Sequence, residues 1–497
     1  MFTRAAESPG ELAADPGTAV GKTVIAMTDG QVGKLASQVA RRIEDDIIRR
    51  GWPVGELVGS ESELRERYRV SRSVLREAVR LVEHHQVARM RRGPNGGLFV
   101  CAPDAGPATL ALVIYLEYVG TSIEDLLRAR LLLEPLAAAL AAERINEDGI
   151  RILRDALQEE EARRAEPGVS SQDRLHVVLG ELSGNSMLRL FIEVLTRLTT
   201  RYAHTSQRTS KADVARAKQD SRDKHAAIVD AVIACEAGQA KILLGGHLEE
   251  VAEWLRSHRR RRPLRRPVTA ESRNGGTRSG AGEKLAEVIA ARIHDDIARD
   301  GWRVGEVLGS EAGLLARYQV SRAVLREAVR ILEYHEVARM RRGPGGGLFI
   351  GSPRPEASID TMALYLDYLG VTGEDLRIVR DAIELGCIPS VTARRDDQQV
   401  VDRLRAAVAR TSEFGGAADL FHTELAELAG NPVLTLFLRI ITQLWSRHAD
   451  MPVPVTSAAP EVERIHGLIV DAIVQGDEGL ARHRMRRHLE ALTAWWH

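Results

Sequence analysis

The stretch that decides the fold is SESELRERYRVSRSVLREAVRLVEHHQVARMRRGPNGGLFV, residues 60–100. Ser60 is followed three residues later by Glu63, a capping-box pattern that predicts a short helix ending near residue 68. Ser71 is placed to cap a longer helix that continues to about residue 85. The segments VARMRR and GGLFV, joined by GPNG, predict a two-stranded hairpin.

A further helix is predicted just upstream, over residues 34–50. Its apolar residues recur at helical spacing, and Gly51 follows them: Leu35, Val39, Ile43 and Ile47. Three helices with a tight turn between the last two, followed by a hairpin, make the pattern of a winged helix-turn-helix domain.

The predicted helix after Ser71 carries arginines on one face. Arg72, Arg76 and Arg80 are each one turn apart, and the opposite face is apolar. Arginines on such a helix can reach base edges in the major groove or bind phosphates. The hairpin adds Arg91 and Arg92 beside glycines, and residues 60–100 hold nine Lys or Arg against five Asp or Glu. This local excess of positive charge predicts a DNA-binding surface rather than only a solvated helix face.

The same unit occurs twice in the chain. Residues 55–100 and 305–350 align without a gap, with 32 identities in 46 positions. The match continues more weakly beyond them, where Arg130 and Glu134 of copy 1 correspond to Arg380 and Glu384 of copy 2. A period near 250 residues is too long for a solenoid. It indicates the duplication of a complete two-part protein.

The chain is therefore predicted to divide into six segments. Residues 1–30 form a disordered tail, and the Pro-, Gly-, Ser- and Arg-rich residues 258–282 form a flexible basic linker. The RRRR run of this linker is either a solvated tether or a supplementary nucleic-acid contact. The winged domains occupy 31–102 and 283–352, and the second parts occupy 105–257 and 355–497.

Composition limits the class of protein. Lys plus Arg and Asp plus Glu number 69 each, so the chain is not uniformly basic and a DNA-binding surface must be local. The three cysteines, Cys101, Cys235 and Cys387, provide neither a disulfide framework nor a CxxC metal knuckle. The sequence has no secretory signal pattern and no run of 18 apolar residues. We expect a cytoplasmic protein without membrane contact.

The stretch 60–100 and its repeat resemble the DNA-binding domain of the GntR superfamily of bacterial regulators, in its FadR-type branch. The resemblance covers both copies, and with the hairpin arginines it implies DNA contacts in each copy. These contacts are Arg72, Ser73, Arg76, Arg91, Arg92, Gly96 and Gly97 in copy 1, and Arg322, Ala323, Arg326, Arg341, Arg342, Gly346 and Gly347 in copy 2. The second helix of copy 2 departs from the pattern because Gly313 lies inside it. Glycine there costs about 1 kcal/mol relative to alanine, so we expect weaker DNA binding by this domain.

The second part of each copy is predicted to be all-helical. Residues 105–257 and 355–497 contain long helical runs, such as IEDLLRARLLLEPLAAALAAER, and no segment with strand alternation. A bundle of six or seven helices resembles the FCD effector domain of the FadR-type branch. The predicted fold class is therefore mainly α, with two copies of a winged helix-turn-helix domain followed by an FCD-like bundle.

Three histidines recur in order and context in each helical part. They are His176, His225 and His247 in copy 1, and His422, His466 and His488 in copy 2. Imidazoles from three helices that converge inside a bundle can hold a divalent metal ion. The alternative is that each histidine is an ordinary core or surface residue.

In the FCD family these histidines match metal ligands, which an aspartate joins. The resemblance implies Asp173 and Asp419 as the further ligands and zinc as the ion. Both aspartates lie three residues before the first histidine, whereas the family usually places this residue four before it. The open positions of such a metal would suit a carboxylate effector. Arg130 and Arg380 either neutralise that effector or pair with the glutamates one turn away.

These features predict a ligand-responsive bacterial transcriptional regulator, a repressor, that binds near-palindromic double-stranded operator DNA and senses a small organic acid. The duplication provides either an intramolecular pseudo-dimer or a dimer of chains with four DNA-binding domains. An architectural DNA-binding protein without an effector is one alternative. A metal-dependent hydrolase is another, but the sequence has no HExxH motif, nucleophile elbow or general base beside the histidines. We therefore expect no enzymatic activity.

Overall fold

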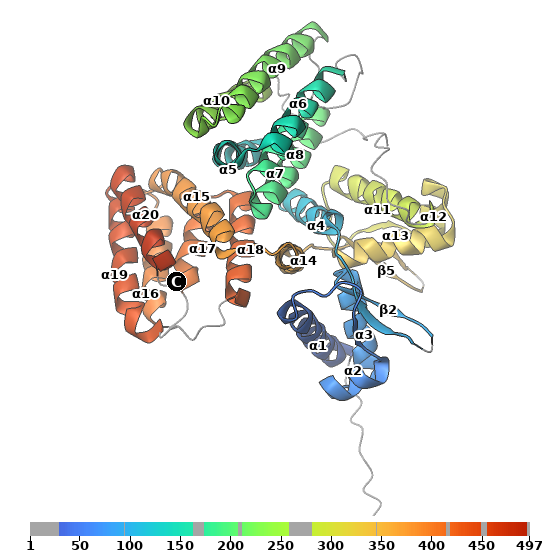
Figure 1. The fold of residues 1–497 in the computed structure, drawn as a ribbon. Coiled ribbons are helices and arrows are strands. Elements are labelled where there is room, and N and C mark those ends of the chain that lie inside the picture. Colours follow the sequence, from blue (N-terminus) through green and yellow to red (C-terminus); the bar gives the residue numbers. More distant parts are fainter. Residues whose placement is uncertain are drawn as a thin grey trace, which may run out of the picture. The chain divides into compact units, whose positions relative to one another are not determined.

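The computed structural model describes residues 29–93, 95–162, 173–206, 211–257, 281–343, 345–413, 418–448 and 455–494 (Figure 1). Its compact units are Met1–Cys101 and Ala102–His497. Helices α1 and α11 begin at Asp29 and Ala281, each two residues before the predicted start of a winged domain at 31 or 283. The rest of the predicted tail and linker lies outside the described residues. Among the described helices, none is both long and apolar enough to cross a membrane.

The first unit has the winged helix-turn-helix architecture that the sequence predicts, and we call it head 1. Its elements are α1 (Asp29–Arg49), β1 (Leu57–Gly59), α2 (Glu61–Tyr68), α3 (Arg72–His84), β2 (Ala88–Arg91) and β3 (Gly97–Val100). The capping box of Ser60 and Glu63 is confirmed, and Ser71 caps α3 as predicted. The hairpin of β2 and β3 is also confirmed. The sheet gains a third strand, β1, which pairs antiparallel with β3.

Packing in head 1 follows the apolar stripe of α3. Leu75, Ala78 and Val82 are completely buried where α3 packs against α1. Two hydrogen bonds support this packing. The Tyr68 hydroxyl donates to Asp46 Oδ2 at 2.7 Å, and Trp52 Nε1 donates to the Cys101 carbonyl at 2.8 Å. The polar face of α3 is thereby left exposed.

Head 2 (residues 281–352) repeats this architecture inside the second unit. Its elements are α11 (Ala281–Arg299), β4 (Val307–Gly309), α12 (Glu311–Tyr318), α13 (Arg322–Tyr334), β5 (Ala338–Arg341) and β6 (Gly347–Ile350). Gly313 lies inside α12, as predicted, at the position that Glu63 occupies in α2. Its amide donates to Ser310 Oγ, but glycine cannot supply the second hydrogen bond of a capping box. The start of α12 is therefore capped less completely than that of α2.

Head 2 packs against α4, the first helix of the helical part of copy 1. Ile114 of α4 is buried in the same apolar cluster as Ile293 and Leu325 of head 2. The rings of Tyr118 and Trp302 lie 5.3 Å apart, and Glu117 Oε2 is 3.3 Å from His294 Nε2. The second head thus shares its core with a helix that lies far before it in the chain.

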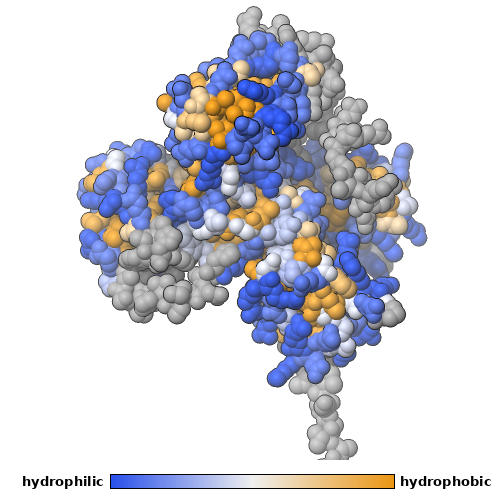
Figure 2. All heavy atoms as spheres, in the orientation of Figure 1, coloured by the Kyte–Doolittle hydropathy of each residue, from blue (hydrophilic) through white to orange (hydrophobic). Residues whose placement is uncertain are grey.

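In the described residues each copy continues into a bundle of seven helices, which confirms the prediction of six or seven. Effector domain 1 contains α4 (Ala105–Tyr118), α5 (Ile123–Arg144), α6 (Glu147–Ala162), α7 (Asp173–Leu182), α8 (Ser186–Ser206), α9 (Lys211–Ile233) and α10 (Ala237–Ser257). Effector domain 2 contains α14 (Pro355–Tyr368), α15 (Gly373–Thr392), α16 (Gln398–Glu413), α17 (Ala418–Leu428), α18 (Pro432–His448), α19 (Val455–Val474) and α20 (Glu478–Ala494). Hydrophilic residues cover most of the visible face, with apolar groups between them (Figure 2).

The two effector domains pack together through equivalent residues. Phe191 of α8 stacks on Phe437 of α18, with ring centroids 3.7 Å apart. Asn185 Nδ2 donates to the Asp375 carbonyl at 3.1 Å, and Asn431 Nδ2 donates to the Asp125 carbonyl at 3.0 Å. Because the sequence equates Asn185 with Asn431 and Asp125 with Asp375, these bonds are reciprocal, as in the interface of a two-fold dimer. One continuous apolar core spans both domains.

Buried His335 at the end of α13 makes an acid-sensitive contribution to the stability of head 2. Burial lowers the pKa of His335 to about 4, below the ordinary value of 6.5. The unfolded chain therefore binds more protons than the folded chain between these values, and stability is lost as pH falls from 6.5 to 4. We expect a loss of about 2 kcal/mol between pH 7 and pH 5.

Urea denaturation of the whole chain at both pH values checks this expectation. The His335→Gln variant should show a smaller stability loss than the unmodified chain. Equal losses in the two proteins would contradict a role for His335.

Candidate metal centres and DNA-binding surfaces

In each head, the predicted recognition residues lie together on the exposed face of one helix, α3 in head 1 and α13 in head 2. Arg72, Ser73 and Arg76 are exposed at the start of α3, and Arg322, Ala323 and Arg326 are exposed at the start of α13. Arg72 Nε lies 2.5 Å from Glu61 Oε1 on the preceding helix. This exposed ion pair orients Arg72 at little energetic cost, so a phosphate or base can replace Glu61. The two faces carry the same positive charges.

The wing arginines divide into two kinds. Arg91 lies over the ring of Phe99 at 4.4 Å, and Arg341 lies over Phe349 at 4.3 Å. Each guanidinium is thus held against its own hairpin while its charge stays exposed. Arg92 and Arg342 are exposed at the ends of strands β2 and β5.

The wing glycines have a structural role that the sequence did not reveal. A Cβ on Gly97 would lie 2.5 Å from Leu57 Cδ1 and 2.8 Å from the Gly59 carbonyl oxygen of β1. A Cβ on Gly96 would lie 2.5 Å from the Arg91 carbonyl oxygen. Gly346 and Gly347 are equally constrained in head 2. These glycines are needed for the close approach of strands, whether or not they also approach DNA.

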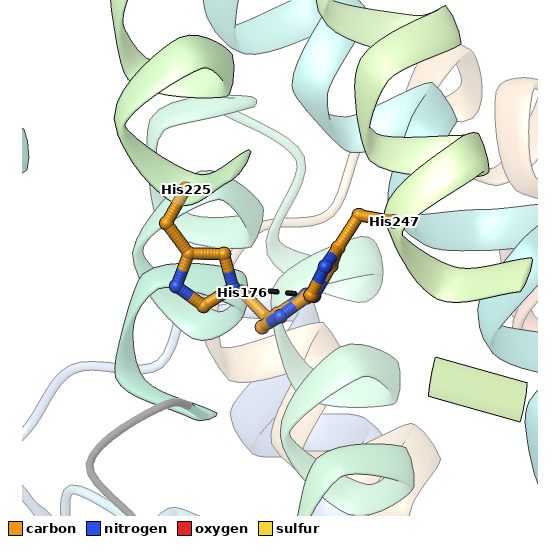
Figure 3. A group of neighbouring side chains, drawn as sticks. All are labelled: His176, His225 and His247. Atoms are coloured by element: carbon orange, nitrogen blue, oxygen red, sulfur yellow. Dashed lines mark hydrogen bonds between the residues drawn. The ribbon is translucent and has the colours of Figure 1, made fainter. Parts of the chain in front are cut away.

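In effector domain 1 the three predicted histidines converge. His176 of α7, His225 of α9 and His247 of α10 are buried, and one ring nitrogen of each lies within 4.8 Å of the others. His225 Nε2 and His247 Nε2 are 3.2 Å apart (Figure 3). Residues more than 70 positions apart in the sequence thus meet at one point in the bundle.

Two buried glutamates orient these rings. His176 Nδ1 lies 2.6 Å from Glu134 Oε2, and His225 Nδ1 lies 2.8 Å from Glu160 Oε2. Because a carboxylate accepts, each Nδ1 donates and the Nε2 lone pair is directed away from the glutamate. This carboxylate–histidine arrangement is typical of the groups that support metal ligands.

The environment sets the protonation states of His247 and Glu134. Burial, together with the neighbouring His176 and His225, lowers the pKa of His247 to about 2. Burial alone would raise the pKa of Glu134, but Arg130 and His176 outweigh it and lower that pKa to about 2. His247 is therefore neutral and Glu134 ionised at neutral pH, as a metal site requires.

Effector domain 2 forms a second cluster of the same kind. His422 of α17, His466 of α19 and His488 of α20 are buried with ligand atoms within 4.8 Å of one another. The Nε2 atoms of His466 and His488 are 3.0 Å apart, and those of His488 and His422 are 3.3 Å apart. Glu384 accepts from His422 Nδ1. Thr411 occupies the position in α16 that corresponds to Glu160.

Both clusters could hold a metal ion, and hydrogen bonds alone do not fully satisfy the second cluster. His488 Nε2 approaches two other Nε2 atoms, but one proton can serve only one of these contacts. Nitrogen ligands about 2.0–2.1 Å from one metal ion are separated by about 3.0–3.4 Å. The observed separations of 3.0, 3.2 and 3.3 Å lie in this range. The side chains of Asp173 and Asp419, the predicted further ligands, lie outside the described residues.

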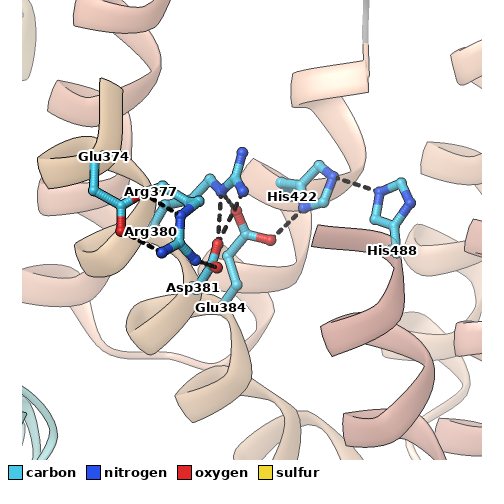
Figure 4. Close-up of polar contacts among 7 residues, drawn as sticks. All are labelled: Glu374, Arg377, Arg380, Asp381, Glu384, His422 and His488. Carbon is cyan, nitrogen blue, oxygen red and sulfur yellow. Dashed lines mark hydrogen bonds and ion pairs between the residues drawn. The ribbon is translucent and has the colours of Figure 1, made fainter. Parts of the chain in front are cut away.

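Arg130 and Arg380, the predicted effector contacts, have different partners. Arg130 is buried, and its Nε donates to Glu134 Oε1 at 2.5 Å. Arg380 instead donates to Asp381 Oδ1 from Nε at 3.1 Å and from Nη2 at 2.9 Å, and lies 3.9 Å from Glu384 (Figure 4). Its guanidinium also stacks on Trp445 at 4.6 Å. Arg130 thus pairs with the glutamate one turn away, whereas the hydrogen bonds of Arg380 go to Asp381, which the sequence did not suggest as a partner.

Three features of these sites were not predicted. Glu160 is hidden in the run QEEEARR, where its neighbours have the same charge. Asp381 has Leu131 as its counterpart in copy 1, so the repeat gives no indication of its role. Burial raises the pKa of Asp381, with Arg380 opposing this effect. Trp445 replaces Thr199 of copy 1, and its contact with Arg380 joins helices α15 and α18.

Comparison with known families identifies the chain. The family described as "Bacterial regulatory proteins, gntR family" matches residues 35–100 and 285–350, and the FCD domain matches residues 125–250 and 375–491. The chain belongs to the GntR family. It is a transcriptional regulator of that family with two helix-turn-helix domains and two FCD domains in tandem. The FadR-type resemblance found in the sequence is thus confirmed.

The relatives show how this GntR chain is organised. The transcriptional repressor NanR of Cronobacter sakazakii is 27% identical over 248 residues, which are 46% of this chain and 91% of NanR. RmpR of Mycobacterium gastri, named as an HTH-type transcriptional regulator, is 33% identical over 203 residues, 37% of this chain and 72% of RmpR. A GntR structure from Streptococcus agalactiae covers 44% of this chain and 99% of its own, at 24% identity and a TM-score of 0.33. Nearly the whole length of NanR thus corresponds to about one half of this chain.

Proposed function

We propose that this GntR protein is a ligand-responsive repressor in which one chain reads both halves of an operator. The observation that carries this proposal is the reciprocal packing of the two effector domains through Asn185 and Asn431. Two heads with equivalent arginine faces are then available to two half-sites about 34 Å apart. The similarity to NanR, which is a repressor, supports the direction of regulation.

The roles of the domains follow the order expected from the sequence, with winged domains at 31–102 and 283–352 and helical domains at 105–257 and 355–497. The heads bind operator DNA through the arginines of α3 and α13. Because these arginines, Arg72, Arg76, Arg322 and Arg326, are all exposed, no rearrangement within a head is needed before they reach the major groove. A DNA-binding role agrees with the cytoplasmic location expected from the sequence.

The histidine clusters are proposed to hold one divalent metal ion each, with zinc as the preferred ion. His176, His225 and His247 would hold one ion, and His422, His466 and His488 the other. When bound, a metal ion with open positions supplies a Lewis-acidic centre for a small carboxylate. Glu134 and Glu384 position His176 and His422, and Arg130 and Arg380 hold positive charge beside those glutamates.

A ligand in the bundle can influence DNA binding only if it prefers one arrangement of the protein. Repression is relieved when the carboxylate binds more tightly to the arrangement that does not fit the operator. Ile114 offers a physical route for this coupling, because α4 belongs to effector domain 1 and contributes to the core of head 2. A shift of α4 would therefore move head 2.

The Glu134→Gln variant tests the proposed orienting role. Glutamine keeps the size of the side chain but removes the charge that stabilises the donating Nδ1 of His176. We expect metal affinity at the first cluster to fall by about 10- to 100-fold. Competition with a chromophoric zinc chelator measures this affinity. The matched control is Glu159→Gln, which changes a partly exposed glutamate that pairs with Arg174 and should leave affinity unchanged.

The proposed function as a whole is tested by the stoichiometry of the DNA complex. We expect one chain to protect two half-sites, as measured by footprinting together with the mass of the complex in solution. Two chains that protect four segments would overturn the proposal. Succinate and citrate, used as carboxylate probes on the zinc-loaded chain, should weaken operator binding. Failure of a broad carboxylate panel would overturn the effector class but not the DNA-binding role.

A further inference from the structure

Where α5 and α15 cross, the two copies carry side chains of different size at equivalent positions. The proposed regulatory function does not require this difference. In α5 the positions facing the partner domain include Leu132 and Leu136, both partly buried against the shared core. Their sequence counterparts in α15 are Ala382 and Gly386. The helix of copy 1 is therefore large at both positions, and the helix of copy 2 is small at both.

The large and small positions meet across the interface. A Cβ built on Gly386 would lie 2.6 Å from Leu132 Cδ2 and 2.7 Å from Leu132 Cδ1. Real Cβ atoms do not approach other atoms so closely, so Leu132 occupies the space that a side chain at 386 would need. The reciprocal bonds of Asn185 and Asn431 relate the two domains by an approximate two-fold axis. This symmetry relates the Leu132–Gly386 contact to the pair Leu136 and Ala382, which both pack against the shared core.

We propose that α5 and α15 form a bump-and-hole interface that fits effector domain 1 only to effector domain 2. Two copies of domain 1 would bring Leu132 against Leu136 on both sides of the axis, where the observed spacing leaves no room. Two copies of domain 2 would bring alanine against glycine and leave two cavities. Overpacking and cavity formation both destabilise an interface. The surface therefore selects the unlike partner and disfavours like pairing between chains.

A set of full-length variants tests this complementarity by thermal unfolding. Gly386→Leu should clash with Leu132, and Leu132→Ala should leave a cavity. We expect each change to lower Tm by about 5 °C. The double variant should have a higher Tm than Gly386→Leu alone, because the new leucine fills the space vacated at 132. Gly373→Leu, in an open position of the same helix, is the control and should not lower Tm.

If the single variants fail to fold, a transposed chain, in which the large and small residues of α5 and α15 are exchanged, still tests the proposal. Ala382→Leu with Gly386→Leu makes both helices large and should prevent normal pairing, seen as a lost or lowered unfolding transition. Adding Leu132→Ala and Leu136→Gly exchanges bump and hole, and should restore a Tm within a few degrees of the unmodified chain. Strictly additive Tm losses in the double variant, or a transposed chain no better than the all-large chain, would overturn the proposal. These measurements involve neither DNA nor metal, so they are independent of the proposed function.

Discussion

Replacement of Arg72, Arg76, Arg322 and Arg326 with alanine is expected to abolish specific operator binding while leaving the fold intact. All four side chains are exposed, so their removal creates no cavity. Each bidentate contact between arginine and a base is worth about 1–3 kcal/mol. Losing two such residues in each head should lower affinity by about 100-fold or more. Fluorescence anisotropy with operator DNA, at one fixed salt concentration, measures this change.

Arg80 and Arg330 provide a matched control for these substitutions. Both are exposed on the same helices but lie further from the helix start and pair with Glu77 and Glu327. Alanine at both positions should weaken binding much less. Specific affinity that survives the fourfold substitution would exclude α3 and α13 as the recognition helices.

Loss of two histidines from one cluster is expected to remove one metal ion per chain. The unmodified protein should bind two ions, and His225→Ala with His247→Ala should bind one. His466→Ala with His488→Ala should also bind one, whereas the fourfold variant should bind none. Elemental mass spectrometry of the purified protein gives these ratios. A ligand at about 100 times its Kd stabilises a folded protein by about 2.7 kcal/mol, so zinc should also raise the Tm of metal-free protein.

The control for metal binding is a buried histidine outside the two clusters. His335 is buried, like the cluster residues, but lies in head 2. His335→Gln should leave the metal content at two ions per chain. A content that is unchanged by the cluster substitutions would show that the histidines serve packing alone.

The architecture of the heads could be predicted because their signals are local. Ser60 and Glu63 define the start of α2 within four residues, and the glycines of GPNGG define the hairpin. Strand β1 was missed, since Leu57–Gly59 is only three residues long and shows no alternation. Its existence depends on pairing with β3, about 40 residues later. Local patterns cannot reveal such a pairing.

The histidine clusters were predictable because the duplication repeats them. A single histidine in a helix gives little information, but three that recur in order suggest a common role. The groups around them were less predictable. Glu160 has glutamate neighbours on both sides, and only the packing of α6 against α9 selects it as the partner of His225. The difference between Arg130 and Arg380 depends on Asp381 and Trp445, which have no equivalents in copy 1.

The pairing of effector domains lies beyond what the sequence could establish. Both copies carry amphipathic helices with similar apolar faces, so the sequence left open whether the copies pair within one chain or between chains. The contact of Phe191 with Phe437 joins positions that are identical in the two copies. Identity at such positions is compatible with like and unlike pairing. Like and unlike pairing are distinguished only by positions at which the two copies carry different residues, such as Leu132 in copy 1 and Gly386 in copy 2.

The stacking of Phe191 on Phe437 inside one polypeptide changes how the regulator responds to its own abundance. A conventional two-subunit repressor must first find a partner, so at low abundance its active form declines with the square of the number of chains. In the proposed one-chain regulator the two halves are made together, so the number of complete regulators would fall only in direct proportion to the number of chains. A cell with very few copies would retain control of the operator. A substitution in one half also appears once rather than twice, which would let the two arginine faces and the two histidine clusters diverge independently.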